Sequence, residues 1–306
     1  MRAIHYVTGL ALTVITGVGC LPADLRPEPG RVVVDVDMPA ALRQAQTVPN
    51  QINFSTGDGW TVTLERFLVS MGNMMLQGPS CTEYASAWYG RVLDVAQPGP
   101  QRLGQLWGLN GCRLTYEVMR PSDNAVLGTG VTEEDRTFMR NAVVPFASDG
   151  KILSDNGMAV YLRGSAQKDQ IQISFDWGFS TGRRFRECQR IIDGQIEEHL
   201  PLVGGETTTL TIGIEPQELF AIVDPMLLPQ QVSIEFLMQR IADADQVQGN
   251  RNGRVSIEEL LVPKMTLRGR EMSVAEILRV VTLPRMFKYG DAGSGCRPEF
   301  ADDDDR

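Results

Sequence analysis

Residues 170–179 read QIQISFDWGF, and this stretch decides the fold class. Its apolar side chains fall on alternate residues from Ile171 to Phe179, which is the period of a strand with one buried face. The same period of two dominates the chain from residue 31 to about residue 215. Further strands are expected at residues 32–38, 60–71, 91–95, 112–119, 160–163 and 207–214. Their β-branched and aromatic content is high, and Gly, Pro, Asn or Asp separates them.

Many short strands with turn signals between them predict a mainly β protein, an antiparallel β-sandwich over residues 31–225. One short helix is expected to interrupt the strands. Thr132 and Asp135 form a capping-box-like start for this helix, which runs through Met139. A small C-terminal helical segment, residues 226–289, completes the predicted architecture.

The helical segment is predicted because the apolar period changes from two to 3.6 after residue 225. One helix carries an apolar stripe formed by Val232, Phe236, Leu237 and Ile241. A second helix is expected to begin near Ser256, and a third at Ser273 with a capping box. Residues 290–306 form an acidic tail, whose four aspartates at 302–305 are typical of a solvated end.

The composition is that of a soluble, acidic protein. The 306 residues include 29 Lys and Arg against 38 Asp and Glu, which gives a net charge of −9 and a sequence pI near 4.9. This balance argues against nucleic-acid binding, because a basic surface is needed to neutralise phosphates. It favours cations as partners. The only histidines are His5 and His199, so nitrogen ligands for a metal are scarce.

The first 20 residues read MRAIHYVTGLALTVITGVGC and have the features of an export signal. Arg2 gives a positively charged start, and an uncharged, mostly apolar stretch follows it. Residues 17–20 resemble the lipobox of bacterial lipoproteins, in which small residues precede a cysteine. The resemblance implies that residues 1–19 are a signal peptide and that Cys20 carries diacylglycerol through a thioether.

Two other outcomes of export stay open. Gly17, Val18 and Gly19 also fit an ordinary small-x-small cleavage site, which would give a plain secreted or periplasmic protein. An uncleaved anchor is the third alternative, although the apolar stretch is short for a membrane span. For a lipoprotein the resemblance implies the outer membrane, because Leu21 rather than Asp follows the cysteine. Residues 20–30 are then a short, proline-rich linker between lipid and domain.

The chain has five cysteines, and an odd number in an exported protein leaves one thiol unexplained. Lipidation of Cys20 accounts for one of them and leaves four, enough for two disulfides in an oxidising compartment. Four cysteines allow three connectivities. The preferred one is Cys81–Cys112 with Cys188–Cys296, because the first pair is close in sequence.

Residues 245–259 read DQVQGNRNGRVSIEE and lie between two expected helices. When residues 246–248 are set aside, the segment resembles the twelve-residue loop of an EF-hand. The resemblance implies a calcium ion bound by Asp245, Asn250, Asn252, the carbonyl of Arg254, Ser256 and Glu259. Calcium is a hard ion that takes six to eight oxygen ligands, and these residues supply oxygen only. Gly253 stands where the loop must turn sharply.

The three-residue insertion leaves the first ligand open between Asp245 and Asp243. Asn stands at two positions where Asp would add charge, so only two carboxylates are expected at the ion. Binding should therefore be weak, with a dissociation constant on the order of 10⁻⁴ to 10⁻³ M. The alternative interpretation of this segment is an ordinary Asn- and Gly-rich turn between helices.

The sequence does not specify the physiological role. The leading hypothesis is a non-enzymatic envelope lipoprotein with a binding or structural role, its partner an envelope protein or a polysaccharide. One alternative is an envelope hydrolase supported by calcium. Another is a copper- or metallophore-associated binding protein. Met71, Met74 and Met75 offer soft sulfur ligands, and the N-terminal β region is similar to periplasmic copper-associated β-sandwich proteins.

Overall fold

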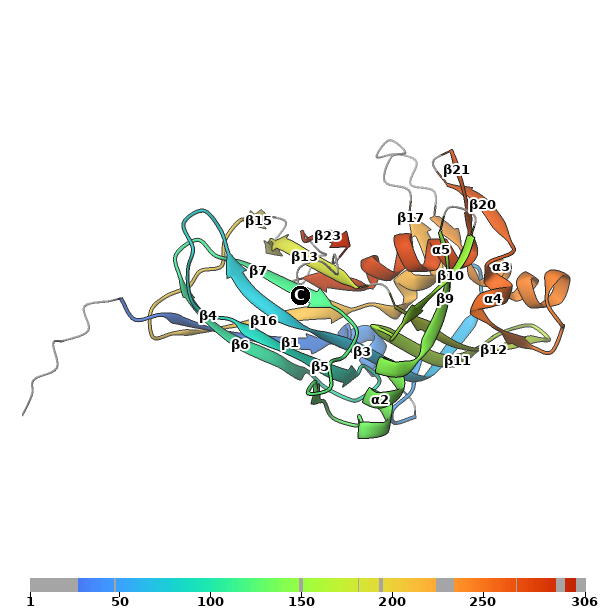
Figure 1. Cartoon of the computed structure of the whole chain (residues 1–306), viewed down its shortest axis with the longest axis horizontal. Helices are drawn as coiled ribbons and strands as arrows, with labels where there is room; N and C mark the ends of the chain where they lie inside the picture. The colour runs from blue at the N-terminus through green and yellow to red at the C-terminus, as the bar shows by residue number, and fades with distance from the viewer. Residues whose placement is uncertain are drawn as a thin grey trace, which may run out of the picture.

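The computed structural model describes residues 27–46, 48–148, 151–180, 182–192, 195–223, 234–267, 269–289 and 295–300. The expected signal peptide, Cys20 and the aspartates at 302–305 lie outside these ranges. The described part is mainly β, as predicted, and is built on two curled sheets (Figure 1). Within these ranges no helix has the length and apolar character needed to cross a bilayer.

The first sheet has five described strands of mixed direction. Across the sheet they are β22 (Phe287–Tyr289), β16 (Thr207–Ile214), β1 (Gly30–Asp37), β6 (Gln101–Leu109) and β4 (Thr82–Ala85). Strand β1 pairs parallel with β16 and antiparallel with β6. The prediction of a wholly antiparallel arrangement is therefore wrong at the β1–β16 pair. Periodicity along one strand reports which face is buried, and it holds no information about the direction of a distant partner.

The second sheet is organised around one long strand, β3 (Thr61–Gln77), of 17 residues. The other described strands of this sheet are β2 (Ile52–Ser55), β5 (Ala87–Asp94), β7 (Arg113–Val118), β8 (Val126–Leu127), β11 (Val160–Lys168), β12 (Ile171–Phe179), β13 (Arg183–Cys188), β19 (Arg254–Val255) and β23 (Arg297–Phe300). Strands β11 and β7 follow each other along one side of β3, and β2 and β5 along the other. At the change from β11 to β7, the Ser70 N–H donates to Ala159 O (2.8 Å) and Ser70 O accepts from the Met119 N–H (3.0 Å). One strand therefore joins two groups of strands into a continuous sheet.

Apolar side chains from both sheets and from the C-terminal helices pack into one core cluster. Strand β12 shows how the sequence builds it, because its alternate residues Ile173, Phe175, Trp177 and Phe179 are all buried. The rings of Phe175 and Trp177 stack with their centroids 4.5 Å apart. Burying each of these side chains contributes roughly 1.5–3 kcal/mol, so this alternation is a major source of stability.

Four two-stranded sheets complete the described β structure. They are β9 (Val143–Ser148) with β10 (Lys151–Asn156), β14 (Arg190–Ile192) with β15 (Gln195–Glu197), β17 (Ala221–Val223) with β18 (Ile234–Phe236), and β20 (Lys264–Leu267) with β21 (Arg270–Ser273). The described helices are α1 (Ala40–Gln44), α2 (Glu133–Asn141), α3 (Met238–Asp243), α4 (Ile257–Leu260) and α5 (Val274–Ile277). Short 3₁₀ and π turns are η1 (Pro216–Phe220), η2 (Ala244–Gln248), η3 (Leu278–Thr282) and η4 (Leu283–Met286).

The prediction of a C-terminal helical segment at 226–289 is not supported. Its described part alternates short helical turns with strands β18 to β22, and β19 and β22 are members of the two main sheets. The predicted apolar stripe is divided, because Phe236 ends β18 and α3 begins only at Met238. Val232 lies outside the described residues. Apolar residues of a strand followed directly by those of a helix imitate the period of one longer helix.

The predicted helix starts, in contrast, are confirmed. Thr132 and Asp135 form a capping box at the start of α2, and the Ser256 side chain caps α4. Ser273 accepts a hydrogen bond from the Glu276 N–H at the start of α5. A cap is set by residues three positions apart, so local sequence is sufficient to predict it.

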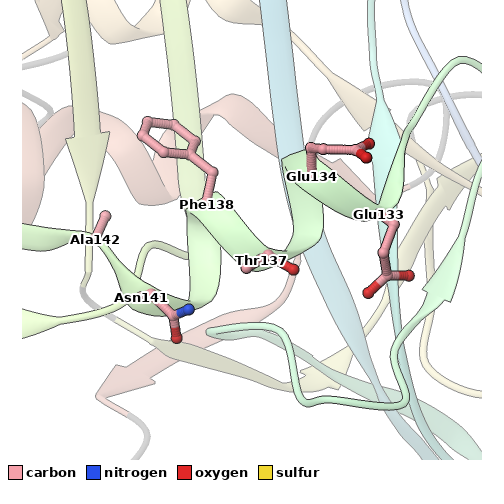
Figure 2. Close-up of a pocket in the computed structure, with 6 residues that line it drawn as sticks. All are labelled: Glu133, Glu134, Thr137, Phe138, Asn141 and Ala142. Carbon is pink, nitrogen blue, oxygen red and sulfur yellow. The ribbon is translucent and has the colours of Figure 1, made fainter.

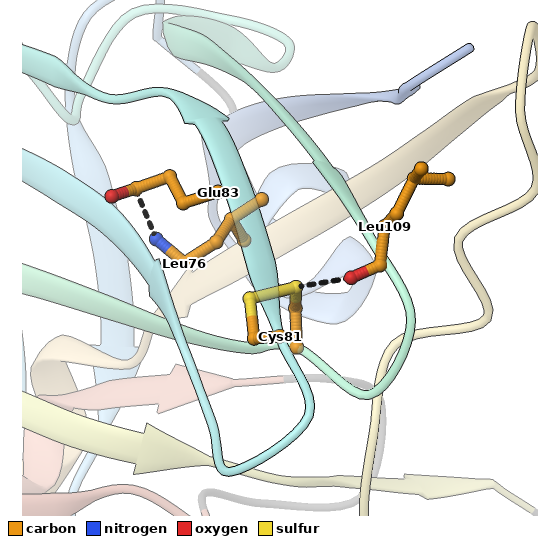
Figure 3. The surroundings of a disulfide bond; sticks show 5 residues. Leu76, Cys81, Glu83 and Leu109 are labelled. Carbon is orange, nitrogen blue, oxygen red and sulfur yellow. Dashed lines mark hydrogen bonds between the residues drawn. A yellow bond between two sulfur atoms is a disulfide. The ribbon is translucent and has the colours of Figure 1, made fainter. Parts of the chain in front are cut away.

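The preferred disulfide pairing is also confirmed, with Cys81–Cys112 and Cys188–Cys296 both formed. The first bridge lies beside the end of β3, where the Leu76 N–H donates to Glu83 Oε1 (2.7 Å; Figure 3). The second bridge joins the end of β13 to the residue before β23. Part of the predicted acidic tail is thus a strand, β23, which pairs with β13.

Candidate metal centre

The segment expected to bind calcium, residues 245–259, begins in the π turn η2, passes through β19 and ends in helix α4. Helix α3 continues directly into the π turn η2, and the chain then loops back to β19. The three additional residues, 246–248, belong to this π turn. A π turn takes up extra residues without ending the helix, and such turns are frequent at functional sites. The insertion therefore leaves Asp245 inside the loop rather than displacing it.

Asp245 is a fully buried carboxylate, with 0% of its surface exposed. Its Oδ1 accepts from the Asn252 N–H (3.1 Å) and its Oδ2 from the Gly253 N–H (3.1 Å). The Gln246 side-chain amide donates to Oδ2 as well (3.1 Å). No Lys, Arg or His of the described chain forms an ion pair with Asp245. A buried charge normally has a partner of opposite charge, so this position is suited to a cation.

Two asparagines of the loop, Asn250 and Asn252, lie next to this carboxylate through a shared backbone N–H. The Asn252 N–H that donates to Asp245 also lies 3.0 Å from Asn250 Oδ1, so the two oxygens are neighbours. The side-chain oxygen of Asn252 accepts from the Arg254 N–H (2.7 Å). Gly253 has a φ of 74°, as the sharp turn in the motif requires.

Glu259 closes the loop from its far end. Its Oε2 accepts from the Ser256 N–H (2.8 Å), while Ser256 Oγ accepts from the Glu259 N–H (3.2 Å). Its Oε1 reaches the Asn250 N–H (3.3 Å). A Cβ at Gly249 would lie 2.4 Å from this Oε1 and 2.8 Å from the backbone Cα of Asp245, so the close approach of the chain there favours glycine.

The structure therefore brings together the six residues predicted from the motif. Asp245, Asn250, Asn252 and Glu259 are connected through shared backbone N–H groups, Ser256 through the helix cap, and Arg254 through β19. Asp243, the other candidate for the first ligand, is exposed and accepts from Gln239 Nε2 on its own helix (3.0 Å). Gly249 and the π turn were not identified from the sequence, because their roles depend on the path of the inserted residues.

The loop is also attached to the second sheet. Gly253 O accepts from the Ser174 N–H (2.8 Å), and Val255 pairs parallel with Phe175. The carbonyl of Val255 accepts from Trp177 Nε1 (2.8 Å), and the Val255 side chain is fully buried in the core. An ion in the loop would therefore stabilise the strand from which the core is built.

The donor set distinguishes this loop from other kinds of metal site. The described residues contain no group of three or more His, Cys, Asp and Glu side chains that could hold a metal. The loop instead combines two carboxylates with carboxamide, hydroxyl and carbonyl oxygens, a set that suits calcium rather than softer metals. Of the three methionines considered for copper, Met71 and Met74 are fully buried in the core cluster. The Gln77 amide lies 2.9 Å from the sulfur of Met75.

An open pocket of about 520 Å³ lies along α2 (Figure 2). It is lined by Glu133, Glu134, Thr137, Phe138, Asn141 and Ala142. Glu133 is paired with Arg136 (2.5 Å). A hydrogen bond from its own backbone N–H, together with one from Thr132, lowers the pKa of Glu134. A general acid needs a raised pKa, so Glu134 is not suited to that role.

No protein family, curated protein or solved structure matches this chain.

Proposed function

We propose that the protein is a non-enzymatic lipoprotein of a bacterial cell envelope, held by Cys20, whose β-sandwich body is stabilised by one calcium ion. The proposal of a calcium ion rests on the buried Asp245 carboxylate. This carboxylate accepts from two backbone N–H groups, and no cationic side chain of the described residues forms an ion pair with it. The sandwich interpretation is supported by the large core cluster to which both sheets contribute. The two disulfides fit an oxidising compartment.

The ion would be held by oxygens of Asp245, Asn250, Asn252, Arg254, Ser256 and Glu259. When bound, it would supply the positive charge that the buried Asp245 lacks. With two oxygens from Glu259 the set offers about seven, within the range that calcium takes. Magnesium requires a smaller, near-ideal octahedron and retains its water, so it is expected to compete poorly.

The proposal is tested by thermal unfolding of the purified protein with calcium and with magnesium. If calcium binds only the folded state, a concentration one hundred times the dissociation constant adds about 2.7 kcal/mol to the free energy of unfolding. The melting temperature should therefore rise with calcium and much less with equal magnesium. A melting temperature that does not change with about 10 mM calcium, roughly ten times the weakest dissociation constant expected for extracellular modules, would leave the segment as a simple connection.

Glu259→Gln provides the matched variant for this experiment. Glutamine retains the size of the side chain and the capping box with Ser256. It replaces the bidentate carboxylate with a neutral carboxamide, so most of the calcium-dependent rise should disappear. The melting temperature in chelator should change little, which separates the loss of the ion from damage to α4.

Lipidation is a separate prediction. Cells that express the protein with labelled palmitate should incorporate the label, because the thiol of Cys20 would carry the diacylglycerol. Cys20→Ala should abolish incorporation and release the protein from the membrane fraction. Label that persists in the variant would refute the anchor at Cys20, whereas a protein that is secreted without any label would identify the ordinary cleavage site.

A further inference from the structure

The hairpin of β9 and β10 presents an open strand edge. In Figure 1 it stands beside α5, which contacts β9. Among the described residues β10 pairs with β9 alone, and all six of its residues are exposed. Large apolar side chains are part of this surface, with Ile152 66%, Leu153 45% and Val143 65% exposed. An open edge with exposed apolar residues is a ready template for pairing with another strand.

The register of the hairpin determines which backbone groups of β10 face outward. The Gly157 N–H donates to Ala142 O (2.6 Å), one step beyond the pair formed by Asn156 and Val143. Because hydrogen-bonded and non-hydrogen-bonded pairs alternate in an antiparallel ladder, residues 151, 153 and 155 bond to β9. The backbone groups of Ile152 and Ser154 then point to the open edge. Pro145, opposite Ser154, occupies a position that needs no N–H, in agreement with this assignment.

Residues 151–155, Lys-Ile-Leu-Ser-Asp, are complementary to themselves when two copies run antiparallel. With Leu153 on the two-fold axis, the outward groups of Ile152 in one copy meet those of Ser154 in the other. Lys151 of each copy then lies opposite Asp155 of the other, which gives two ion pairs. Registers centred on Ile152 or on Ser154 also join outward groups, but they place Lys151 opposite Leu153 or Gly157. The pairing of opposite charges and the positions of the outward backbone groups therefore both favour the register centred on Leu153.

Lys151 and Asp155 are both exposed, and Asp155 also attracts the Arg279 guanidinium electrostatically. Within the described part of one chain, Lys151 and Asp155 make no ion pair, and Asp155 Oδ1 accepts only from the Asn156 N–H (2.8 Å). In the ladder they lie on the same face of β10 as Leu153, because side chains of alternate residues share a face. Opposite charges directly across two strands stabilise the pair, and like charges destabilise it.

We propose that the protein forms a two-fold symmetric dimer in which β10 pairs antiparallel with β10 of a second copy, centred on Leu153. The contact is isologous, since the same residues serve both copies. A strand pair of this length is smaller than the roughly 1,200–2,000 Å² of stable interfaces, so the dimer is weak, with a dissociation constant on the order of 10–100 µM.

Sedimentation velocity of the purified protein, from about 1 to about 500 µM, measures this equilibrium. Lys151→Glu alone or Asp155→Lys alone places like charges at two symmetric positions, and each should weaken the dimer about tenfold. The double variant exchanges the two charges and should restore the original constant. Because both side chains are exposed, the melting temperature of the protein provides a check that the fold is unchanged.

A cysteine at the axis tests the register directly. Leu153→Cys should form a disulfide between two copies under oxidising conditions, because opposed residues in a non-hydrogen-bonded pair lie about 4.5 Å apart at Cα, within disulfide range. Asn156→Cys is the control, because in this register the two copies of residue 156 are not opposite each other and cannot form a disulfide. A protein that stays monomeric over the whole concentration range would overturn the dimer. A dimer indifferent to the charge variants, or linked equally well through position 156, would overturn β10 as its interface.

Discussion

Removing the Cys188–Cys296 disulfide, by Cys188→Ala with Cys296→Ala, should lower the free energy of unfolding by about 4.8 kcal/mol on the chain-entropy account. The bridge closes a segment of 108 residues, so its loss frees a large part of the unfolded chain. It also releases β23, whose Phe300 ring lies 3.4 Å from the Arg183 guanidinium. Arg183 is only 4% exposed, and burial lowers its pKa to about 10. Loss of this packing adds to the expected effect.

The Cys81–Cys112 bridge is the internal comparison. It closes 31 residues, and the same relation gives about 3.7 kcal/mol for its removal. Chemical denaturation of the two double variants should therefore rank the Cys188–Cys296 pair as the larger contributor, by roughly 1 kcal/mol. The reverse order would show that native packing around the first bridge, rather than the length of the closed segment, controls the stability it provides.

The strands that the sequence predicted are those in which one face is apolar and buried. In β12, Ile173, Phe175 and Trp177 alternate with exposed residues, and the pattern is visible without any knowledge of neighbours. Strand β13 lies outside the strands expected from periodicity, and its buried Arg183 looks like a surface residue in a sequence. In β6 a buried position is Gly104, where a Cβ would lie 2.3 Å from Met74 Cε. Close packing at this position requires glycine, which has no side chain and therefore does not contribute to an apolar pattern in the sequence.

The loop proposed to bind calcium was likewise predictable only in part. The residue types at Asp245, Asn250, Asn252 and Glu259 follow from the chemistry of the ion, so the motif alone was enough to propose them. The path of the chain between the first two could not be predicted, because three inserted residues can bulge from a loop or enter a helix. In the structure the inserted residues enter the π turn η2, which continues helix α3. Helix α3 is itself held in place by its buried residues Met238 and Ile241.

Asp245→Ala should have the largest effect of any single change in the loop. It removes the acceptor of the Gly253 N–H and one of the two acceptors of the Asn252 N–H, and a hydrogen bond to a charged group contributes about 1.5–3 kcal/mol. The free energy of unfolding in chelator should fall by roughly 1.5–3 kcal/mol on that basis. The variant should also lose the calcium-dependent gain, about 2.7 kcal/mol at one hundred times the dissociation constant. Urea denaturation with chelator and with calcium measures the two contributions separately.

Asp243→Ala is the matched control, because it deletes the same group two residues earlier in the chain. Asp243 is exposed and bonds to Gln239, so its loss should change the free energy of unfolding by no more than about 0.5 kcal/mol and leave the calcium-dependent gain intact. If Asp243→Ala abolished the gain while Asp245→Ala retained it, Asp243 would be the first ligand. Asp245 would then be a buried carboxylate that serves only the backbone of the loop. The burial of Asp245, its two N–H donors and the attachment of the loop to Trp177 all favour the opposite result.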